Sequence, residues 1–220
     1  MKNAIYTKLP NPERLKEILL SQSSLDIIMN DEEDAWLRLS SFYKNYFDGI
    51  DMVKIDNGAG DNMYILFSKD GVIIKGFDHE SILSPYGNYE EKIAKGIYDS
   101  VPIELMELLK DESIEVNDVT FCIWRSQNDS SWKKGDVIVS EGYKEDDDGE
   151  GFLLGYVFDD ADSWIDWGKD YYEKEIPLEY VKTIYEHKDI TREVIEKINP
   201  KRDVDAVIKE LKEIGILIKY

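Results

Sequence analysis

Cysteine is almost absent from this chain of 220 residues, since Cys122 is its only one. A single cysteine excludes any intramolecular disulfide framework. The neighbours of Cys122, which are Phe121, Ile123 and Trp124, indicate a buried strand position rather than a reactive thiol.

Long apolar runs are also lacking. No stretch approaches the roughly 18 apolar residues that a membrane-spanning helix needs. The first residues, MKNAIYTKLPNPERLKEI, show neither the apolar core nor the small-residue cleavage site of a secretory signal. We therefore expect a soluble, cytoplasmic protein without a membrane partner.

Positive charge is scarce, because 27 basic residues stand against 47 acidic ones and leave a formal net charge of -20. Proteins that bind nucleic acid use clustered Lys and Arg to displace counterions from phosphates, and no dense basic run occurs here. Nucleic acid is thus not expected as a partner. The acidic field would speed the encounter with a basic protein, although solubility alone is a second explanation of the charge.

The chain is long enough to bury a sizeable core, and its hydrophobic content of 42% favours one domain covering residues 1–220. Apolar residues at helical spacing after Pro10 predict a first helix from Pro12. A second helix is predicted from residues 31–34, whose four acids would suit its positive end. Aromatic residues at intervals of three and four extend this helix to Gly49.

Three strands are predicted next, at residues 51–56, 62–67 and 71–77. The dipeptides Asn57-Gly58 and Asp70-Gly71 separate apolar segments, and glycine accepts the positive φ that tight hairpins require. These strands should form an antiparallel meander that packs against the aromatic face of the second helix.

The remaining pattern completes an α+β fold with a mostly antiparallel central sheet and helices at both chain ends. The β-branched and aromatic segment VTFCIW, residues 119–124, is predicted as a central strand. Further strands are expected at 136–140 and 152–158. Helices are expected at about 89–97, after Ser100, and at 176–187, 191–198 and 203–214.

Two loops resemble ligand-binding motifs only in part. The segment Gly58-Ala59-Gly60-Asp61 leads into a strand and has no following lysine, so it does not fit a phosphate-binding loop. The acidic run KEDDDGEG, residues 144–151, places Val157 where a calcium loop needs a bidentate glutamate. A solvated loop is the simpler interpretation of this run, with weak, nonspecific cation binding as the alternative.

Asp78, His79 and Glu80 form the sharpest local cluster of titratable side chains. A histidine beside carboxylates can act as a general base near neutral pH, or can ligate a metal together with the second histidine, His187. Neither metal-binding histidine spacings nor a nucleophile elbow is present. We therefore predict a structural His79 with no metal and no cofactor, and we keep an enzyme site at Asp78, His79 and Glu80 as the alternative.

The segment DDADSWIDWGKDYY interleaves acidic and aromatic residues. Protein interfaces use tryptophan and tyrosine as anchors, so the segment is a candidate partner-binding face. Core packing would use the same aromatic residues. The candidate partner-binding residues are Trp164, Trp167 and Tyr171, with Asp159, Asp160, Asp162, Asp166 and Asp170.

Residues 60–85, GDNMYILFSKDGVIIKGFDHESILSP, resemble a segment of small bacterial proteins of the toxin-immunity type, most recognisably at residues 76–81. The nearest named group is the SUKH superfamily. This resemblance implies an acidic, cytoplasmic α+β protein that acts by binding rather than by catalysis. The sequence as a whole thus predicts a non-enzymatic, acidic protein-binding module whose partner is basic, a toxin being the proposed example. A small-molecule or metal-dependent enzyme is the alternative.

Overall fold

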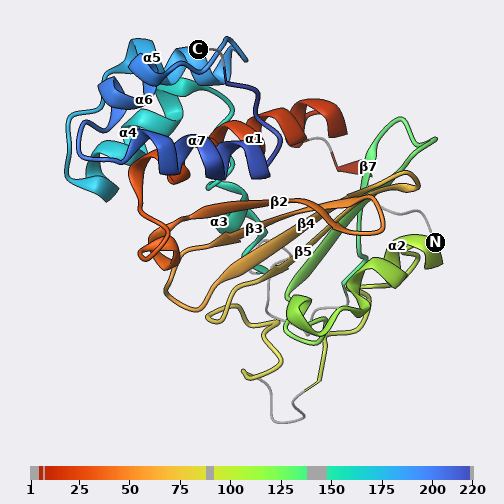
Figure 1. The fold of residues 1–220 in the computed structure, drawn as a ribbon. Coiled ribbons are helices and arrows are strands. Elements are labelled where there is room, and N and C mark those ends of the chain that lie inside the picture. Colours follow the sequence, from red (N-terminus) through yellow and green to blue (C-terminus); the bar gives the residue numbers. More distant parts are fainter. Residues whose placement is uncertain (1–4, 7, 88–91, 138–147, 219–220) are drawn as a thin grey trace. The chain divides into compact units, whose positions relative to one another are not determined.

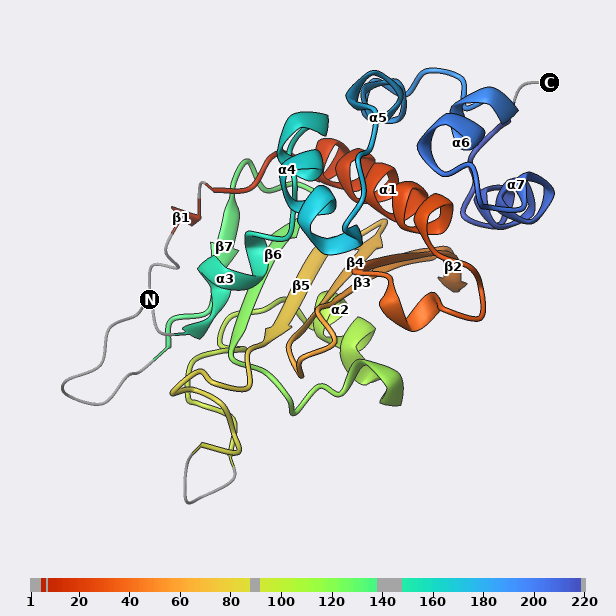
Figure 2. The same ribbon diagram turned by 90° about the vertical axis from the view of Figure 1, so that its left-hand side faces the viewer.

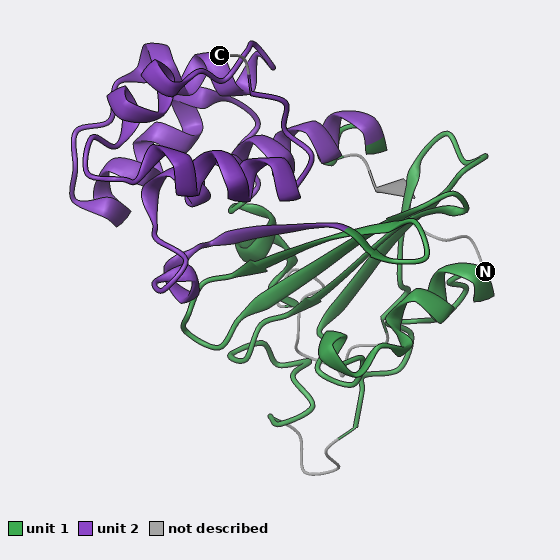
Figure 3. Ribbon diagram, in the orientation of Figure 1, with its two compact units in different colours: residues 1–12, 45–156 green, residues 13–44, 157–220 purple. Residues whose placement is uncertain are grey.

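The computed structural model describes residues 5–6, 8–87, 92–137 and 148–218. It has the predicted α+β architecture, with one mainly antiparallel sheet and helices towards both chain ends (Figure 1). The chain divides into two compact units, coloured separately in Figure 3. We call residues 1–12 and 45–156 the sheet unit, and residues 13–44 and 157–220 the helical unit. The expectation of a single domain over 1–220 stays a prediction.

Within the described residues, the sheet has seven strands in the order β1-β7-β6-β5-β4-β3-β2. Its centre is the predicted meander, in which Val53 pairs with Ile65 and Ile65 pairs with Ile74, all antiparallel. Figure 1 shows β3, β4 and β5 side by side. The segment predicted at 119–124 is confirmed as β6, which pairs with β5. The strands are β1 (Ile5–Tyr6), β2 (Ser40–Phe47), β3 (Ile50–Asp56), β4 (Asn62–Ser68), β5 (Gly71–Phe77), β6 (Phe121–Ser126) and β7 (Trp132–Lys134).

The predicted second helix at 31–49 is wrong, because residues 40–47 form strand β2. Only a short 3-10 turn, η1 (Ala35–Leu37), is helical in this range. Asp48 and Gly49 both have positive φ, at 39° and 80°, as the two-residue turn of a hairpin requires. Aromatic residues are common in strands as well as on the buried face of a helix, so their spacing at three and four positions does not by itself indicate a helix.

One face of the sheet is covered by α2 (Ile103–Met106) and by the 3-10 turns η2 (Glu107–Lys110) and η3 (Glu112–Ile114) (Figure 2). Side chains at alternate positions of the strands supply this core from the sheet side. The buried cluster consists of Ile50, Met52, Tyr64, Leu66, Ile73, Cys122 and Trp124 from the sheet, with Ile97, Leu105, Leu108, Leu109, Ile114 and Val119 from the covering segment.

The described part of the helical unit contains five α-helices, and those predicted near the C-terminus are confirmed. The helices are α1 (Pro12–Met29), α4 (Ala161–Tyr172), α5 (Leu178–Tyr185), α6 (Arg192–Ile198) and α7 (Val204–Glu213). The first turns of three of them, α4, α6 and α7, are capped by side chains that accept backbone N–H bonds, namely Asp160, Thr191 and Asp203.

The C-terminal end of α1 is closed by side chains from the far end of the chain. Asn199 Nδ2 donates to the carbonyl oxygens of Ile28 and Met29 at 3.0 and 3.1 Å. Arg202 donates twice to the carbonyl of Ile27, at 3.3 Å from Nε and 3.2 Å from a terminal nitrogen. These bonds satisfy carbonyls that have no partner within the helix.

Three other sequence predictions need correction. Residues 150–154 form helix α3 (Glu150–Leu154), not a strand at 152–158, and Gly149 precedes it with a φ of 80°. Of the strand expected at 136–140, residues 136–137 are not in a strand and residues 138–140 lie outside the described residues, whereas β7 occupies the earlier residues Trp132–Lys134. Residues 92–97 are not helical, and the first part of that predicted helix is also outside the described residues.

Among the described residues, no helix combines the length and the apolar character that crossing a membrane requires.

Candidate functional site

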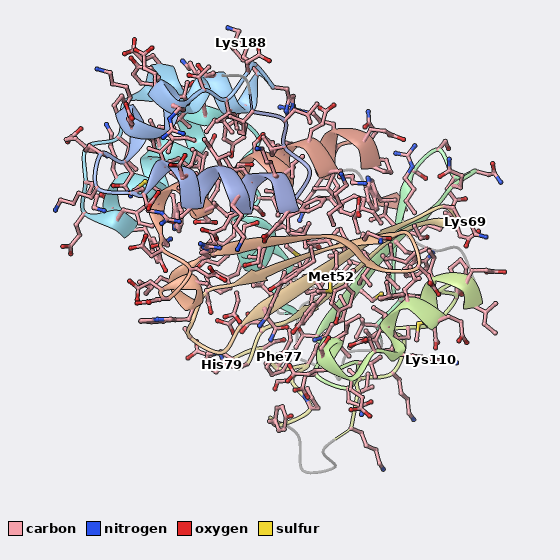
Figure 4. The ribbon with its side chains drawn as sticks, in the orientation of Figure 1. Met52, Lys69, Phe77, His79, Lys110 and Lys188 are labelled. Atoms are coloured by element: carbon pink, nitrogen blue, oxygen red, sulfur yellow. The ribbon has the colours of Figure 1, made fainter. Side chains whose placement is uncertain are left out.

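His79 follows the end of β5 and is tied to Asp61 in the loop between β3 and β4. Its backbone N–H donates to Asp61 Oδ1 at 2.9 Å, and its ring Nδ1 lies 2.6 Å from the same oxygen. Asn57 Nδ2 donates to the other carboxylate oxygen at 2.8 Å. Figure 4 labels His79 and Phe77 at this end of the sheet. The Asp61 side chain is 5% exposed and the His79 side chain is 46% exposed, so a buried carboxylate orients an accessible imidazole.

The electrostatics of the pair favour charge on both side chains. Burial raises the pKa of Asp61, but the hydrogen bonds from His79 and Asn57 outweigh burial and lower it overall. The hydrogen bond to Asp61 raises the pKa of His79 above its ordinary value. With Nδ1 facing the carboxylate, Nε2 is the ring atom left to exchange protons.

Asp78 and Glu80 take different roles beside this pair. The Asp78 backbone N–H donates to Thr120 Oγ1 at 3.2 Å, and its Oδ1 accepts the Glu80 N–H at 2.9 Å. A Cβ at Gly149 would lie 2.3 Å from the Asp78 Cβ, so only glycine allows this close approach. Glu80 is exposed, with its carboxylate 4.0 Å from His79 Nε2. Asp78 thus shapes the turn, while Glu80 faces solvent.

One potential ligand atom from each of Asp61, Asp78 and His79 lies within 4.8 Å of the others. Such an oxygen and nitrogen set has the chemistry of a divalent-cation site. However, the short contact between His79 Nδ1 and Asp61 places a proton between them, and a cation would have to displace it. Sequence reasoning missed Asp61, although the glycine-rich loop that carries it was noted.

The acidic run at 144–151 ends in a buried ion-pair cluster. Lys134 Nζ lies 2.5 Å from Asp148 Oδ2 and 2.9 Å from Glu150 Oε2, and Lys8 lies 3.4 Å from Glu150 Oε1. Both carboxylates are at most 6% exposed at the side chain. Lysines therefore neutralise these two acids, which makes them unsuited to a calcium loop. Residues 144–147 lie outside the described residues.

The predicted partner-binding residues of α4 divide into core and surface. Trp164 is fully buried, and Trp167 is half-buried and stacks on Phe158 and Tyr171, with ring centroids 5.2 and 4.6 Å apart. Tyr171 is 42% exposed. Of the predicted anchors, Trp167 and Tyr171 therefore have side-chain surface that a partner could contact, and Trp164 has none. The five predicted acids, Asp159, Asp160, Asp162, Asp166 and Asp170, are all exposed.

An exposed tryptophan that sequence reasoning placed in a helix core adjoins Tyr171. Trp36 is 75% exposed in η1, and the Tyr171 hydroxyl donates to the carbonyl of the next residue, Leu37, at 2.8 Å. Asp31, Asp34, Leu37 and Tyr171 line one groove of about 520 Å³. The remaining lining residues are Met29, Asn30, Tyr172, Lys174, Asn199, Lys201 and Arg202.

The wall of this groove is held in place by buried polar contacts. The Tyr172 hydroxyl donates to Asp26 and accepts from Asn30 Nδ2, the latter at 3.2 Å. Ser40 N–H donates to Asp26 Oδ2 at 2.9 Å. Burial raises the pKa of Asp26 to about 7, against the opposing effect of these hydrogen bonds. A fixed groove loses less conformational freedom when a partner binds.

The second histidine, His187, lies in the helical unit just after α5. Its Nε2 is 3.6 Å from a carboxylate oxygen of Glu17, and its backbone φ is 52°. Its ion-pair partner among the described residues is thus one exposed carboxylate rather than a ligand set.

We expect the pKa of His79 to depend on Asp61. Asp61→Asn should move this pKa down towards 6.5, because the carboxylate that stabilises the imidazolium is removed. The stability that the contact provides should be complete below pH 6.5 and lost as the pH rises through the raised value. NMR titration of the ring Cε1–H measures the pKa, and His187→Gln assigns the signals.

Glu80→Gln is the matched control, since Glu80 is a lesser cause of the shift than Asp61. An unchanged pKa in Asp61→Asn would show that the Asp61 contact does not govern His79.

The sequence matches no protein-family model, and its comparison with curated proteins and with solved structures gives no significant match.

Proposed function

We propose that this chain is a non-enzymatic protein-binding module that captures a basic partner through the helical unit. The observation that carries the proposal is the exposure of Trp36 among acids and beside the groove. Following the SUKH-like resemblance of residues 60–85, the partner that we propose is a basic toxin.

We call the proposed contact region the acidic-aromatic surface, and define it by residues 31–34, Trp36, Asp170 and Tyr171. Trp36 and Tyr171 are 75% and 42% exposed. Tryptophan and tyrosine are enriched among the residues that dominate binding energy, because they bury a large area at low entropic cost. The bond from Tyr171 to the Leu37 carbonyl keeps the two aromatic residues on adjoining segments.

Charge supports a basic partner rather than an acidic one. Residues 31–34 are four consecutive exposed acids, and Asp170 adds a fifth beside Tyr171. Arg202, whose side chain lines the groove and is only 4% exposed, already pairs with Asp31 and Glu210. The groove itself is not purely acidic, because Lys174 and Lys201 also line it. The negative charge of the acidic-aromatic surface is therefore concentrated at residues 31–34.

The experiment compares capture of proteins from the native lysate by the wild-type chain and by Trp36→Ala. A captured partner is then measured by surface plasmon resonance. Trp36→Ala should raise the dissociation rate about 30-fold, which corresponds to about 2 kcal/mol. Asp34→Asn should mainly slow association. Association should also slow as salt shortens the Debye length below about 8 Å.

Phe152→Ala is the matched control, because Phe152 is an aromatic residue of the sheet unit that is 50% exposed. It should leave both rates unchanged. A partner that binds without salt dependence, and equally well to Trp36→Ala, would contradict the proposal and leave solubility as the explanation of the charge.

A second candidate function is small-molecule chemistry at His79. The observation that favours it is the buried Asp61, which orients the imidazole and leaves Nε2 accessible. Mixtures of small metabolites can be screened by the NMR signal of the His79 ring. A saturable shift that is absent in His79→Gln would support this function, and no shift with any mixture would count against it.

A further inference from the structure

Two carboxylates and one imidazole converge at the end of the sheet where β5 finishes. Asp61 comes from the loop between β3 and β4, and Asp78 and His79 follow β5 directly. One oxygen of each carboxylate and one ring nitrogen all lie within 4.8 Å of one another. The antiparallel register brings them together, because Asn62, next to Asp61, pairs with Phe77, next to Asp78.

The charges of these three side chains do not balance. The ionised carboxylates of Asp61 and Asp78 carry two negative charges, and a protonated His79 supplies one positive charge. Among the residues that the structure describes, neither carboxylate forms an ion pair with a lysine or an arginine. Two carboxylates that share a site repel each other. A divalent cation between them would offset both charges.

A second acidic pair of the sheet unit is neutralised in a different way. Lys134 Nζ lies 2.5 Å from the Asp148 carboxylate and 2.9 Å from that of Glu150. Lys8 lies 3.4 Å from Glu150 as well. Two ammonium groups therefore offset two carboxylates in that cluster. Asp61 and Asp78 have only the imidazole of His79 in the corresponding role.

The site has ligand atoms available and is open to solvent on one side. Asp78 Oδ1 accepts the Glu80 N–H at 2.9 Å, whereas Asp78 Oδ2 has no hydrogen bond or ion pair within the described part of the chain. The His79 side chain is 46% exposed. Water molecules can therefore complete the coordination of an ion held by three side chains.

Binding of an ion requires one small rearrangement. His79 Nδ1 and Asp61 Oδ1 lie 2.6 Å apart with a proton between them. Two ligand atoms that are each about 2.0–2.2 Å from one metal ion lie about 3 Å from each other, so this contact must open by roughly half an ångström. The exposed imidazole can turn by this amount, while Asn57 holds the other oxygen of Asp61 at 2.8 Å.

We propose that Asp61, Asp78 and His79 bind one divalent transition-metal ion, such as Zn²⁺, in place of the shared proton. Imidazole nitrogen together with carboxylate oxygen suits Zn²⁺, whereas Mg²⁺ prefers oxygen ligands and keeps most of its water. This proposal departs from the sequence-based prediction of no metal, which rested on the absence of histidines at ligand spacing. The fold instead supplies Asp61, 18 positions before His79. The inference concerns the sheet unit and is independent of the proposed protein binding.

The test is isothermal titration calorimetry with Zn²⁺ on the wild-type chain, purified without a histidine tag. About 0.15 M salt screens weak binding to the exposed acids, and we expect one saturable site per chain. Asp78→Asn should lower the affinity at least about tenfold, because the loss of even an outer partner of a metal site costs about 10–100-fold. Its amide oxygen can still accept the Glu80 N–H, so the turn is kept. His79→Gln should lower the affinity by at least as much.

His187→Gln is the matched control, since His187 is the other histidine and lies beside one exposed carboxylate of the helical unit. It should leave the stoichiometry and the affinity unchanged. The absence of a saturable site, or an unchanged affinity in His79→Gln, would overturn the proposal. Displacement of Zn²⁺ by an equal concentration of Mg²⁺ would also overturn it, because nonspecific binding to carboxylates would then explain the heat. A loss of affinity in Glu80→Gln but not in Asp78→Asn would place the ion outside the proposed site.

Discussion

Phe67→Ala is expected to lower the free energy of unfolding by about 3–5 kcal/mol, because it removes a large buried side chain from the centre of the sheet and leaves a cavity. Phe67 is 7% exposed on β4, where it pairs with Asp51 of β3 and Val72 of β5. Denaturant unfolding measures the change, provided that the slope against denaturant concentration is unaltered.

Lys69→Ala is the control for this measurement, since Lys69 is exposed in the turn that follows β4. It should change the free energy of unfolding by less than about 0.5 kcal/mol. A loss below about 1 kcal/mol in Phe67→Ala would show that the surroundings of Phe67 collapse onto the smaller side chain.

Arg202→Met is expected to destabilise the helical unit by about 3–5 kcal/mol. Its side chain is 4% exposed and pairs with Asp31 and with Glu210, the latter at 2.8 Å. Methionine would keep most of the volume, but it would leave the Ile27 carbonyl and part of the Glu210 carboxylate unpaired. Removing one partner of a buried ion pair is costly because the other charge stays buried.

Arg192→Met provides the matched comparison for this second prediction. Arg192 pairs with Asp205, but their side chains are 45% and 80% exposed, and exposed pairs contribute about 1 kcal/mol or less. Thermal unfolding of the two variants should therefore differ clearly. Equal losses would mean that Arg202 does not secure the end of α1.

The sequence predicts the meander well because its signals are local. Asn57-Gly58 and Asp70-Gly71 fix the ends of strands whose apolar residues have no competing helical pattern. The helix expected at 31–49 failed for an opposite reason. Aromatic residues spaced at three and four positions fitted a helix, while the equally local turn at Asp48-Gly49, which makes a hairpin, was interpreted only as a helix end.

The candidate sites were less predictable, because they depend on pairings between distant segments. Asp78, His79 and Glu80 were found from their adjacency, but the partner that orients His79 is Asp61, 18 positions earlier. Trp36 was predicted to be a core residue of the helix expected at 31–49. In the structure it lies in the 3-10 turn η1 instead, and it is 75% exposed.

The capping of α1 by Asn199 and Arg202 affects the order in which the chain can fold during synthesis. The helical unit is discontinuous in sequence, since it consists of residues 13–44 and 157–220. Its first segment is therefore synthesised well before its second. Apart from residues 1–12, the sheet unit is formed by one continuous stretch, residues 45–156. On the ribosome, the sheet unit can therefore fold while α1 is already outside the exit tunnel but still lacks the residues that close its end. A chain interrupted after residue 156 would contain the strands but would lack Asn199 and Arg202, so the last carbonyl groups of α1 would have lost the side chains that cap them.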